Sequence, residues 1–328
     1  MKVLVTGASG FIGSALVDRL QKEGHDVYAL TRYVASDSRY DFYQLKKKII
    51  CDVRNGDRVS TIIGETKPDV VIHLAAMSAV SYSFLSLETS REVSEVIYMG
   101  TMNVAQACLT HKVPHLINAS TSEFYGFQDK FPIEEDAKPA PLSPYAVAKL
   151  AAEEYLWFLW RTEGLPFTTI RPYNTYNRSR VNKPYFVVER AITQALTDNH
   201  IHLYTPTPVR DLLDRDSHID AYVKAVDVIK KGLGKSLVGQ AINIGTAKGY
   251  TIGEMVERVV AIMKRLYGVD VETSWDMAPD RPHDIHTLIC SNKKAWDYLD
   301  WRPLYTLDEG LEIAIKDWND VLKLKGKG

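Results

Sequence analysis

The first thirteen residues constrain the fold of this chain more than any other segment. Lys2–Thr6 has the apolar, β-branched character of a short strand, and Ser14–Leu20 has the spacing of a helix. Between them lies a turn that carries glycine at three positions, Gly7, Gly10 and Gly13. Glycine allows a tight turn and close approach of a ligand, and the following helix offers free N–H groups and the positive end of its dipole. This order predicts a site for the pyrophosphate of a dinucleotide; the alternative is an ordinary tight turn between strand and helix.

Composition excludes several classes of protein. The 328 residues are 45% hydrophobic and carry a formal net charge of -1, so we expect neither nucleic acid nor a membrane as partner. The three cysteines, Cys51, Cys108 and Cys290, lie far apart, and the nine histidines show no metal-ligand spacing, so we expect no disulfide and no metal. No apolar run approaches the ~18 residues of a membrane span, and no cleavable signal precedes the first strand. We therefore expect a cytoplasmic protein.

Strand-like and helical segments alternate through the first half of the chain. Regular alternation of this kind predicts a parallel sheet with helices on both faces, the Rossmann-type doubly wound α/β fold. The apolar run Val70–Leu74 suits a strand that is buried on both sides. The expected strands are 26–31, 48–51, 70–74, 115–119 and 167–171, and the expected helices are 59–65, 92–111 and 145–163.

The pattern changes after residue 172. Segment 174–220 contains three prolines and irregular polar stretches, and we expect little regular structure there. Segment 240–245 has strand character, and helical spacing follows at 251–266 and 307–322.

This change in pattern predicts two domains. Residues 1–173 form the dinucleotide-binding domain, and residues 174–328 form mainly a smaller C-terminal substrate-binding lobe. Some segments around 210–245 are expected to return to the Rossmann sheet.

A tyrosine and a lysine form the second strong signal. Ser143 is a good helix N-cap and Pro144 a good first helical residue, so Tyr145 and Lys149 lie four residues apart on one helix face. A lysine cation beside a phenol lowers the pKa of the tyrosine, which otherwise lies near ~10, and makes it a usable base. The alternative is a pair on a surface helix. The glycine turn upstream favours the catalytic interpretation.

A polar segment follows the strand expected at 115–119. Ligands of open α/β sheets bind outside the carboxyl ends of the strands, which is where Thr121, Ser122 and Glu123 would lie. These side chains are candidates for substrate contact. The alternative is a Ser/Thr turn that hydrogen-bonds its own backbone.

With these residues in hand, the chain resembles the extended short-chain dehydrogenase/reductases, specifically the nucleotide-sugar epimerases and dehydratases. The resemblance covers nearly the whole chain. It depends on Gly7, Gly10 and Gly13, on Asp52 and Val53, on His73–Ala76, on Ser120–Gly126, on Tyr145 and Lys149, on Arg171–Asn174, on Arg210 and Asp211, and on Arg281–Asp284.

Within this family the triplet Thr121-Ser122-Glu123 looks like that of 4,6-dehydratases, and the sequence around Tyr145 is similar to GDP-mannose 4,6-dehydratases. Arg281–Asp284 looks more like UDP- or dTDP-sugar enzymes, which leaves the nucleotide open. The resemblance implies an NAD(P)-dependent nucleotide-sugar 4,6-dehydratase. The alternatives are a nucleotide-sugar 4-epimerase of the UDP-glucose/galactose type and, after it, a UDP-glucuronate decarboxylase.

The resemblance also implies roles in a dehydratase cycle. Tyr145, with Lys149 nearby, takes the proton of the sugar 4-hydroxyl while C4 is oxidised, and Thr121 hydrogen-bonds the C4 oxygen. Glu123 removes the C5 proton as water is lost across C5–C6, and hydride returns to C6. Ser122 occupies the position at which dTDP-glucose enzymes have an aspartic acid, so Glu123 must also carry the proton to the departing hydroxyl.

Binding residues follow from the same resemblance. Thr31 leaves the end of the second strand without the acidic residue that bonds the ribose of NAD, and Arg32 could meet a 2′-phosphate, which favours tightly bound, recycled NADP with NAD as the alternative. Arg32 could also be a solvated surface residue. The implied cofactor residues are Gly7, Gly10, Phe11, Ile12, Gly13, Arg32, Asp52, Val53, Leu74, Ala75, Ala76, Tyr145 and Lys149. The implied substrate residues are Ser78, Thr121, Asn174, Arg210 and Arg281, where arginine suits the diphosphate and Arg210 could instead pair with Asp211.

Two further expectations concern assembly and class. Family members pair the helix of Tyr145 with that of 92–111 in a four-helix interface, so we expect a homodimer. Two other kinds of protein remain possible: a redox-sensing regulator that binds the dinucleotide without chemistry, and a reductase that releases its cofactor each turn. The intact Tyr145 and Lys149 pair argues against the regulator.

Overall fold

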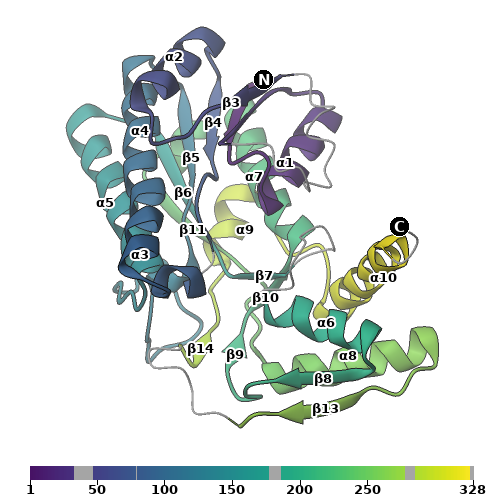
Figure 1. The fold of residues 1–328 in the computed structure, drawn as a ribbon. Helices are drawn as coiled ribbons and strands as arrows, with labels where there is room; N and C mark the ends of the chain where they lie inside the picture. Colours follow the sequence, from purple (N-terminus) through teal and green to yellow (C-terminus); the bar gives the residue numbers. More distant parts are fainter. Residues whose placement is uncertain (33–46, 79, 177–185, 278–284, 326–328) are drawn as a thin grey trace.

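The computed structural model describes residues 1–32, 47–78, 80–176, 186–277 and 285–325. Figure 1 shows a central sheet with helices on both sides and, beneath it, a second group of helices and short strands. The N-terminus begins the central sheet, and the C-terminal helix belongs to the second group. Among the described helices, none is both long enough and apolar enough to cross a membrane.

Seven parallel strands form the central sheet in the order β11-β6-β5-β4-β1-β2-β3. Val5 of β1 is in register with Ala29 of β2 on one side and with Ile72 of β4 on the other, so the strand order reverses at β1. This topology confirms the predicted Rossmann-type doubly wound fold. The strands are β1 (Lys2–Thr6), β2 (Asp26–Thr31), β3 (Lys48–Ile50), β4 (Val70–His73), β5 (His115–Ala119), β6 (Phe167–Pro172) and β11 (Gln240–Ile244).

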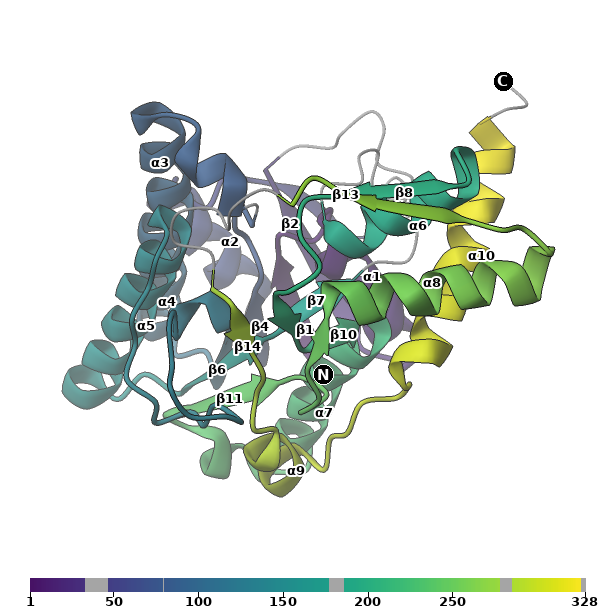
Figure 2. The ribbon, with the colours of Figure 1, turned by 90° about the horizontal axis from the view of Figure 1, so that it is seen from below.

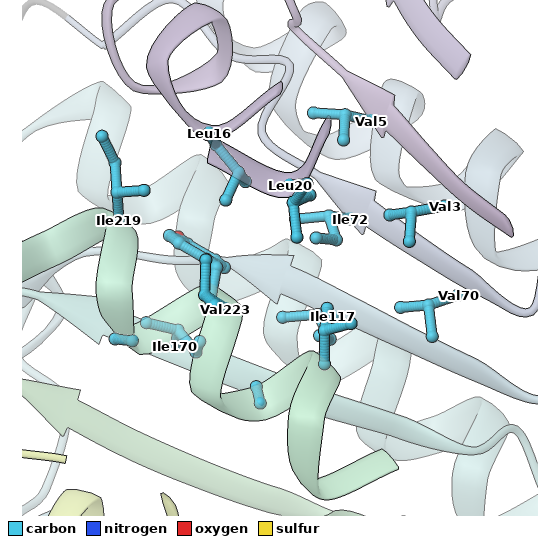
Figure 3. Close-up of a cluster of buried hydrophobic side chains, with 14 of the residues drawn as sticks. Val3, Val5, Leu16, Leu20, Val70, Ile72, Ile117, Ile170, Ile219 and Val223 are labelled. Atoms are coloured by element: carbon cyan, nitrogen blue, oxygen red, sulfur yellow. The ribbon is translucent and has the colours of Figure 1, made fainter. Parts of the chain in front are cut away.

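Helices cover both faces of this sheet because successive strand residues point to opposite sides. Val5 contributes to the apolar cluster under α1, α7 and α9, whereas Leu4 contributes to the cluster under α2, α4 and α5. Figure 3 shows Leu16 and Leu20 of α1 and Val223 of α7 packed together over the first face. Full burial of each such side chain contributes about 1.5–3 kcal/mol. The helical segments around the sheet are α1 (Phe11–Lys22), α2 (Gly56–Thr66), η2 (Val80–Phe84), α3 (Leu87–Ser94), η3 (Glu95–Met99), α4 (Gly100–Thr110), η4 (Ser122–Phe124), α5 (Pro144–Glu163), α7 (Arg215–Lys230), η5 (Gly234–Leu237) and α9 (Lys293–Leu299).

The helix expected at 92–111 begins earlier and is not uniform. Ser86 caps α3 by accepting a hydrogen bond from the backbone N–H of Thr89 at 3.1 Å, and α3 continues through the π-helical turn η3 into α4. The Ser86 cap is a sequence signal that the apolar spacing alone did not reveal.

The C-terminal lobe has its own core. Figures 1 and 2 both show α6, α8 and α10 side by side, away from the central sheet. Their buried faces meet through Ile192, Val259 and Leu311. The elements of this half outside the central sheet are β7 (Asn174–Tyr176), α6 (Val187–Thr197), β8 (His200–Leu203), β9 (Val209–Arg210), β10 (Leu212–Asp214), β12 (Tyr250–Thr251), α8 (Ile252–Tyr267), β13 (Glu272–Trp275), β14 (Thr287–Leu288) and α10 (Leu307–Lys325).

The expectation of little regular structure over 174–220 is wrong. Helix α6 lies within this segment, and its buried residues Val188, Ala191, Ile192 and Ala195 follow helical spacing. Helix α7 begins in the same segment and packs against α1, and β11 lies beside β6 in the central sheet. The prediction that the chain divides into domains at residue 173 stays a prediction.

Candidate active site

A cavity of about 400 Å³ follows the carboxyl edge of the central sheet, where the topology predicts a ligand. It brings together fourteen residues that the sequence singled out: Gly7, Gly10, Phe11, Ile12, Gly13, Arg32, Asp52, Val53, Leu74, Ala75, Ala76, Ser78, Tyr145 and Lys149. These residues come from the segments that follow β1, β2, β3 and β4, from the start of α1 and from α5. Their roles remain predictions.

The glycine turn has the backbone that only glycine tolerates well. Gly7 has a φ of +68°, and a Cβ there would lie 2.8 Å from the backbone nitrogen of Ala75. A Cβ on Gly13 would lie 2.2 Å from the carbonyl oxygen of Gly7. Gly10 is the N-cap of α1 and has no side chain with which to cap the helix. The first turn of α1 is therefore open to an anion, which fits the pyrophosphate of a dinucleotide.

The end of β2 forms the rim at which the ribose of a dinucleotide is expected. Thr31 is buried and shares a hydrogen bond with Ser9. Arg32 is partly exposed, and its Nη1 lies 3.4 Å from a carboxylate oxygen of Glu92. Arg32 is thus a partly exposed residue with a carboxylate beside it, and it is not fully solvated.

Asp52 lies on the same rim and is held by its neighbour Arg54. The Nη2 atom of Arg54 donates to Oδ2 of Asp52 at 2.7 Å, and hydrogen bonding by Arg54 lowers the pKa of the Asp52 carboxyl. The carboxylate stays charged and fixed at neutral pH.

Tyr145 and Lys149 lie on the buried face of α5, as their spacing predicts. Ser143 caps this helix by accepting a hydrogen bond from the N–H of Ala146, and Pro144 is its first residue. Lys149 donates to the carbonyl oxygen of Ala119 at 2.6 Å, and burial lowers the pKa of its ammonium group to about 8, opposed by the charge of a carboxylate one turn further along α5.

The expected effect of Lys149 on the pKa of Tyr145 is not found. Burial raises the pKa of the Tyr145 phenol to about 12, and a hydrogen bond with Thr121 only partly offsets this. The negative charge of Glu123 raises the pKa further. Desolvation of the phenolate is the largest effect on the Tyr145 pKa, so the predicted lowering of that pKa is wrong for this structure.

The triplet Thr121-Ser122-Glu123 does not itself line the cavity, but Thr121 and Glu123 interact with Tyr145 of the cavity wall. The cavity wall includes Ala119 and Ser120, and Thr121 reaches the Tyr145 hydroxyl from the adjoining turn. Thr121 also accepts a hydrogen bond from the N–H of Glu123 at 3.2 Å, which begins η4. Ser122 is buried, whereas Glu123 is half-buried and close enough to act on the charge of Tyr145.

A buried ionic network supports this turn from behind. Glu153, two turns after Tyr145 on α5, accepts from the Ser120 hydroxyl and pairs with Arg171 at 2.7 Å. Arg171 also donates to the hydroxyl of Tyr125 at 2.9 Å. Both charged side chains are almost fully buried, so the network fixes β5, β6 and α5 relative to one another.

The predicted substrate residues are more dispersed. Asn174 lies at the start of β7, and its side-chain oxygen is buried without a hydrogen-bond partner. Arg210 lies on β9 and donates to the carbonyl oxygens of Val209 and His286 at 3.0 Å each. Neither lines the cavity described above, and Arg281 lies outside the described residues.

The alternative interpretation of Arg210 as an ion-pair partner of Asp211 is not supported by the contacts of the aspartate. Asp211 is buried and accepts hydrogen bonds from the hydroxyl and N–H of Thr246, both at 2.7 Å, and from the N–H of Ala247 at 2.9 Å. The Asp211 carboxylate therefore holds the loop that follows β11 through these hydrogen bonds.

Sequence reasoning missed two polar residues of the cavity wall, His218 and Tyr222 on α7. The helical spacing i, i+4 was present in the sequence, but only the packing of α7 against α1 turns this face to the cavity. His73 is buried at the end of β4 and hydrogen-bonds Thr6 at 2.8 Å.

The fold and the cavity define a Rossmann-type protein, and comparisons with known proteins are specific about its family. A family model described as GDP-mannose 4,6 dehydratase matches residues 4–314. A UDP-glucose 4-epimerase of Lactobacillus helveticus is 28% identical over 96% of both chains. Among solved structures, the UDP-glucose 4-epimerase of Thermotoga maritima with UDP-glucose has a TM-score of 0.84 at 27% identity, covering 98% of this chain and 100% of that one. The UDP-glucuronic acid 4-epimerase of Bacillus cereus, in complex with UDP-glucuronic acid and NAD, gives the same TM-score, identity and coverage.

The chain therefore belongs to the GDP-mannose 4,6-dehydratase family of the extended short-chain dehydrogenase/reductases, the nucleotide-sugar epimerases and dehydratases. This confirms the resemblance noted from its motifs. It also confirms that the protein is an enzyme of this group.

Proposed function

We propose that this enzyme oxidises C4 of a nucleotide-diphosphate sugar, removes water across C5–C6 and returns hydride to C6, as a nucleotide-sugar 4,6-dehydratase does. The observation that carries the proposal is that Tyr145, in the wall of the cavity that also includes the glycine turn, interacts with Thr121 and Glu123. When a nicotinamide dinucleotide is bound there, it supplies the acceptor and the donor of hydride.

The residues of the chain then divide the proton transfers. Tyr145 accepts the proton of the 4-hydroxyl, and Thr121, already hydrogen-bonded to Tyr145, holds the oxygen of that carbon. The Lys149 ammonium, held by the Ala119 carbonyl, contributes positive charge to the same end of the cavity. Once ionised, a phenol with a raised pKa is a stronger base. Because that pKa keeps Tyr145 protonated at neutral pH, a positive charge must stabilise the Tyr145 phenolate while the substrate is bound.

Glu123 distinguishes dehydration from epimerisation. Loss of water across C5–C6 needs a base for the C5 proton and an acid for the departing hydroxyl, and a half-buried carboxylate can serve as both in turn. Inversion at C4 needs neither. The second candidate function is 4-epimerisation, and it is favoured by the curated and solved relatives, which include several UDP-sugar 4-epimerases.

Glu123→Gln is expected to reduce dehydration by about 10²–10⁴-fold because the amide can neither accept nor donate the proton. The measurement is incubation with GDP-, UDP-, dTDP- and CDP-sugars followed by mass analysis for loss of water. Glu134→Gln is the matched control, because it makes the same neutral replacement at an exposed glutamate outside the cavity wall, and it should leave the rate unchanged. Full dehydration by the Glu123 variant would remove that residue from the mechanism, and a wild-type product of unchanged mass would favour the epimerase.

For the cofactor we propose NADP, with NAD as the alternative. Thr31 offers no carboxylate to the ribose, and Arg32 lies on the cavity rim with a carboxylate at 3.4 Å as its competitor. NAD is supported by the solved relative from Bacillus cereus, which contains it.

Arg32→Ser is expected to weaken NADP binding by about tenfold or more, since a hydrogen bond to a charged group contributes about 1.5–3 kcal/mol, and to leave NAD binding unchanged. Titration calorimetry with both cofactors measures this. Arg161→Ser removes an exposed guanidinium in the last turn of α5, outside the cavity wall, and should change neither affinity. Equal affinity of the wild-type protein for NAD and NADP would remove the argument for Arg32.

We further propose a nucleotide-diphosphate sugar as the small-molecule partner and a homodimer as the assembly. The dimer is supported by exposed apolar side chains on the neighbouring segments α3, η3 and α5, namely Leu87, Met99 and Phe158. Single exposed apolar residues are normal on a monomer, whereas several on neighbouring elements are typical of an interaction surface.

A further inference from the structure

Two buried polar atoms on α7 have no hydrogen-bond partner among the residues that the structure describes. His218 and Tyr222 lie one turn apart and both line the cavity, with 5% and 0% of their surfaces exposed. The Nε2 atom of His218 and the hydroxyl of Tyr222 are each buried without a hydrogen bond. An unsatisfied buried polar atom is costly, and two of them side by side on a cavity wall suggest a ligand.

The hydrogen bonds of His218 determine which of its nitrogens carries a proton. Thr175 donates its hydroxyl proton to the carbonyl oxygen of Tyr173 at 3.1 Å, and the same Thr175 oxygen lies 2.9 Å from Nδ1 of His218. Thr175 must therefore accept from an Nδ1–H. Burial lowers the pKa of His218 to about 3, so the ring is neutral. Its Nε2 is then a lone-pair acceptor on a residue that lines the cavity.

Tyr222 supplies the complementary group. Its hydroxyl can donate, and its ring lies 5.4 Å from that of His218 at 31°. Two neighbouring residues of the wall thus offer one acceptor and one donor. A primary amide, with N–H groups and a carbonyl oxygen in one plane, matches that pair.

We propose that His218 and Tyr222 bind the carboxamide of the nicotinamide ring, with Nε2 of His218 accepting from its N–H group and the Tyr222 hydroxyl donating to its carbonyl oxygen. This rests on the proposed function, which puts the nicotinamide beside Tyr145. Tyr222 is close enough to Tyr145 for the two hydroxyls to interact electrostatically. The cavity wall also includes Pro172, so this end of the cavity is bounded by β6, α5 and α7.

Binding of cofactor analogues tests each hydrogen bond separately. The probes are NADP, NAD, their 3-acetylpyridine analogues, which keep the carbonyl but lack the N–H, and ADP-ribose, which lacks the ring. Titration calorimetry on the full chain measures each affinity in the absence of sugar. Wild-type protein should bind the better natural cofactor about tenfold more tightly than its acetylpyridine analogue.

The two variants have different expected signatures. His218→Leu should abolish the preference for the carboxamide over the acetyl group, because it removes the acceptor of the N–H. Tyr222→Phe should weaken both ligands by a similar factor, about tenfold, because both keep the carbonyl. ADP-ribose binding should be unchanged in both variants, and this serves as the check that each is folded.

The outcomes separate this inference from the proposed function. If wild-type protein binds dinucleotide and His218→Leu keeps its full preference for the carboxamide, the histidine contact is wrong. Unchanged affinities in Tyr222→Phe would overturn the tyrosine contact, and this variant carries the test if the leucine variant fails to fold. If neither ADP-ribose nor any dinucleotide binds wild-type protein, the proposed function fails and this inference fails with it.

Discussion

Replacing Tyr145 with phenylalanine is expected to lower kcat for nucleotide-sugar turnover by at least about 10²–10⁴-fold, because the change removes the only group proposed to take the C4 hydroxyl proton. The ring packs beside Val93 and Ile97, and phenylalanine keeps that packing. Cofactor affinity and thermal stability should therefore stay close to those of the wild-type protein. Steady-state rates with the active sugar, together with cofactor titration, measure both effects.

Tyr155→Phe is the matched control for this experiment. Tyr155 lies on the same helix, and its hydroxyl accepts a hydrogen bond from Gln106 at 2.6 Å, away from the cavity wall. Its loss should leave kcat within about twofold of the wild-type value, since a surface change away from special features has little effect. A Tyr145 variant with more than a tenth of normal activity would show that another group takes the proton.

Arg171→Met is expected to lower the free energy of unfolding by about 3–5 kcal/mol. The guanidinium makes three contacts of 2.7–3.2 Å with the carboxylate of Glu153. Its removal leaves that buried charge with the Ser120 hydroxyl and the electrostatic interaction with Lys149. Urea unfolding followed by tryptophan fluorescence and circular dichroism measures the loss.

The control for Arg171 is another arginine–glutamate pair in a different environment. Arg265 contacts Glu312 at 2.8 Å on the surface, and Arg265→Met should cost about 0–1 kcal/mol. The double variant Arg171→Met/Glu153→Leu should recover much of the lost stability, because no charge is then left buried. Similar losses for the Arg171 and Arg265 variants would show that burial does not strengthen the inner pair.

The features that sequence predicted well are local ones. The glycine turn needs only a strand, three glycines and a helix start within one short segment, and Gly7 and Gly13 are held there by close backbone contacts. The common face of Tyr145 and Lys149 follows from helical spacing alone. The central strands were predictable because a strand buried on both faces must be apolar throughout.

The features that sequence missed depend on contacts between distant elements. His218 and Tyr222 reach the cavity only because α7 packs on α1, and their spacing alone is also that of an ordinary helix face. The raised pKa of Tyr145 depends on burial that no residue pattern states. Helix α6 was different, because its apolar spacing was present and the neighbouring prolines obscured it.

The position of β11 affects how the protein folds while it is being synthesised on the ribosome. This strand lies next to β6 at the edge of the sheet, but the chain reaches it only after α6 and α7 have been synthesised. Until then the nascent chain presents an unpaired strand edge and lacks the helix that covers α1, both of which invite aggregation. The seven-stranded sheet therefore cannot reach its final form early in translation, because its edge strand β11 is encoded far downstream of β6.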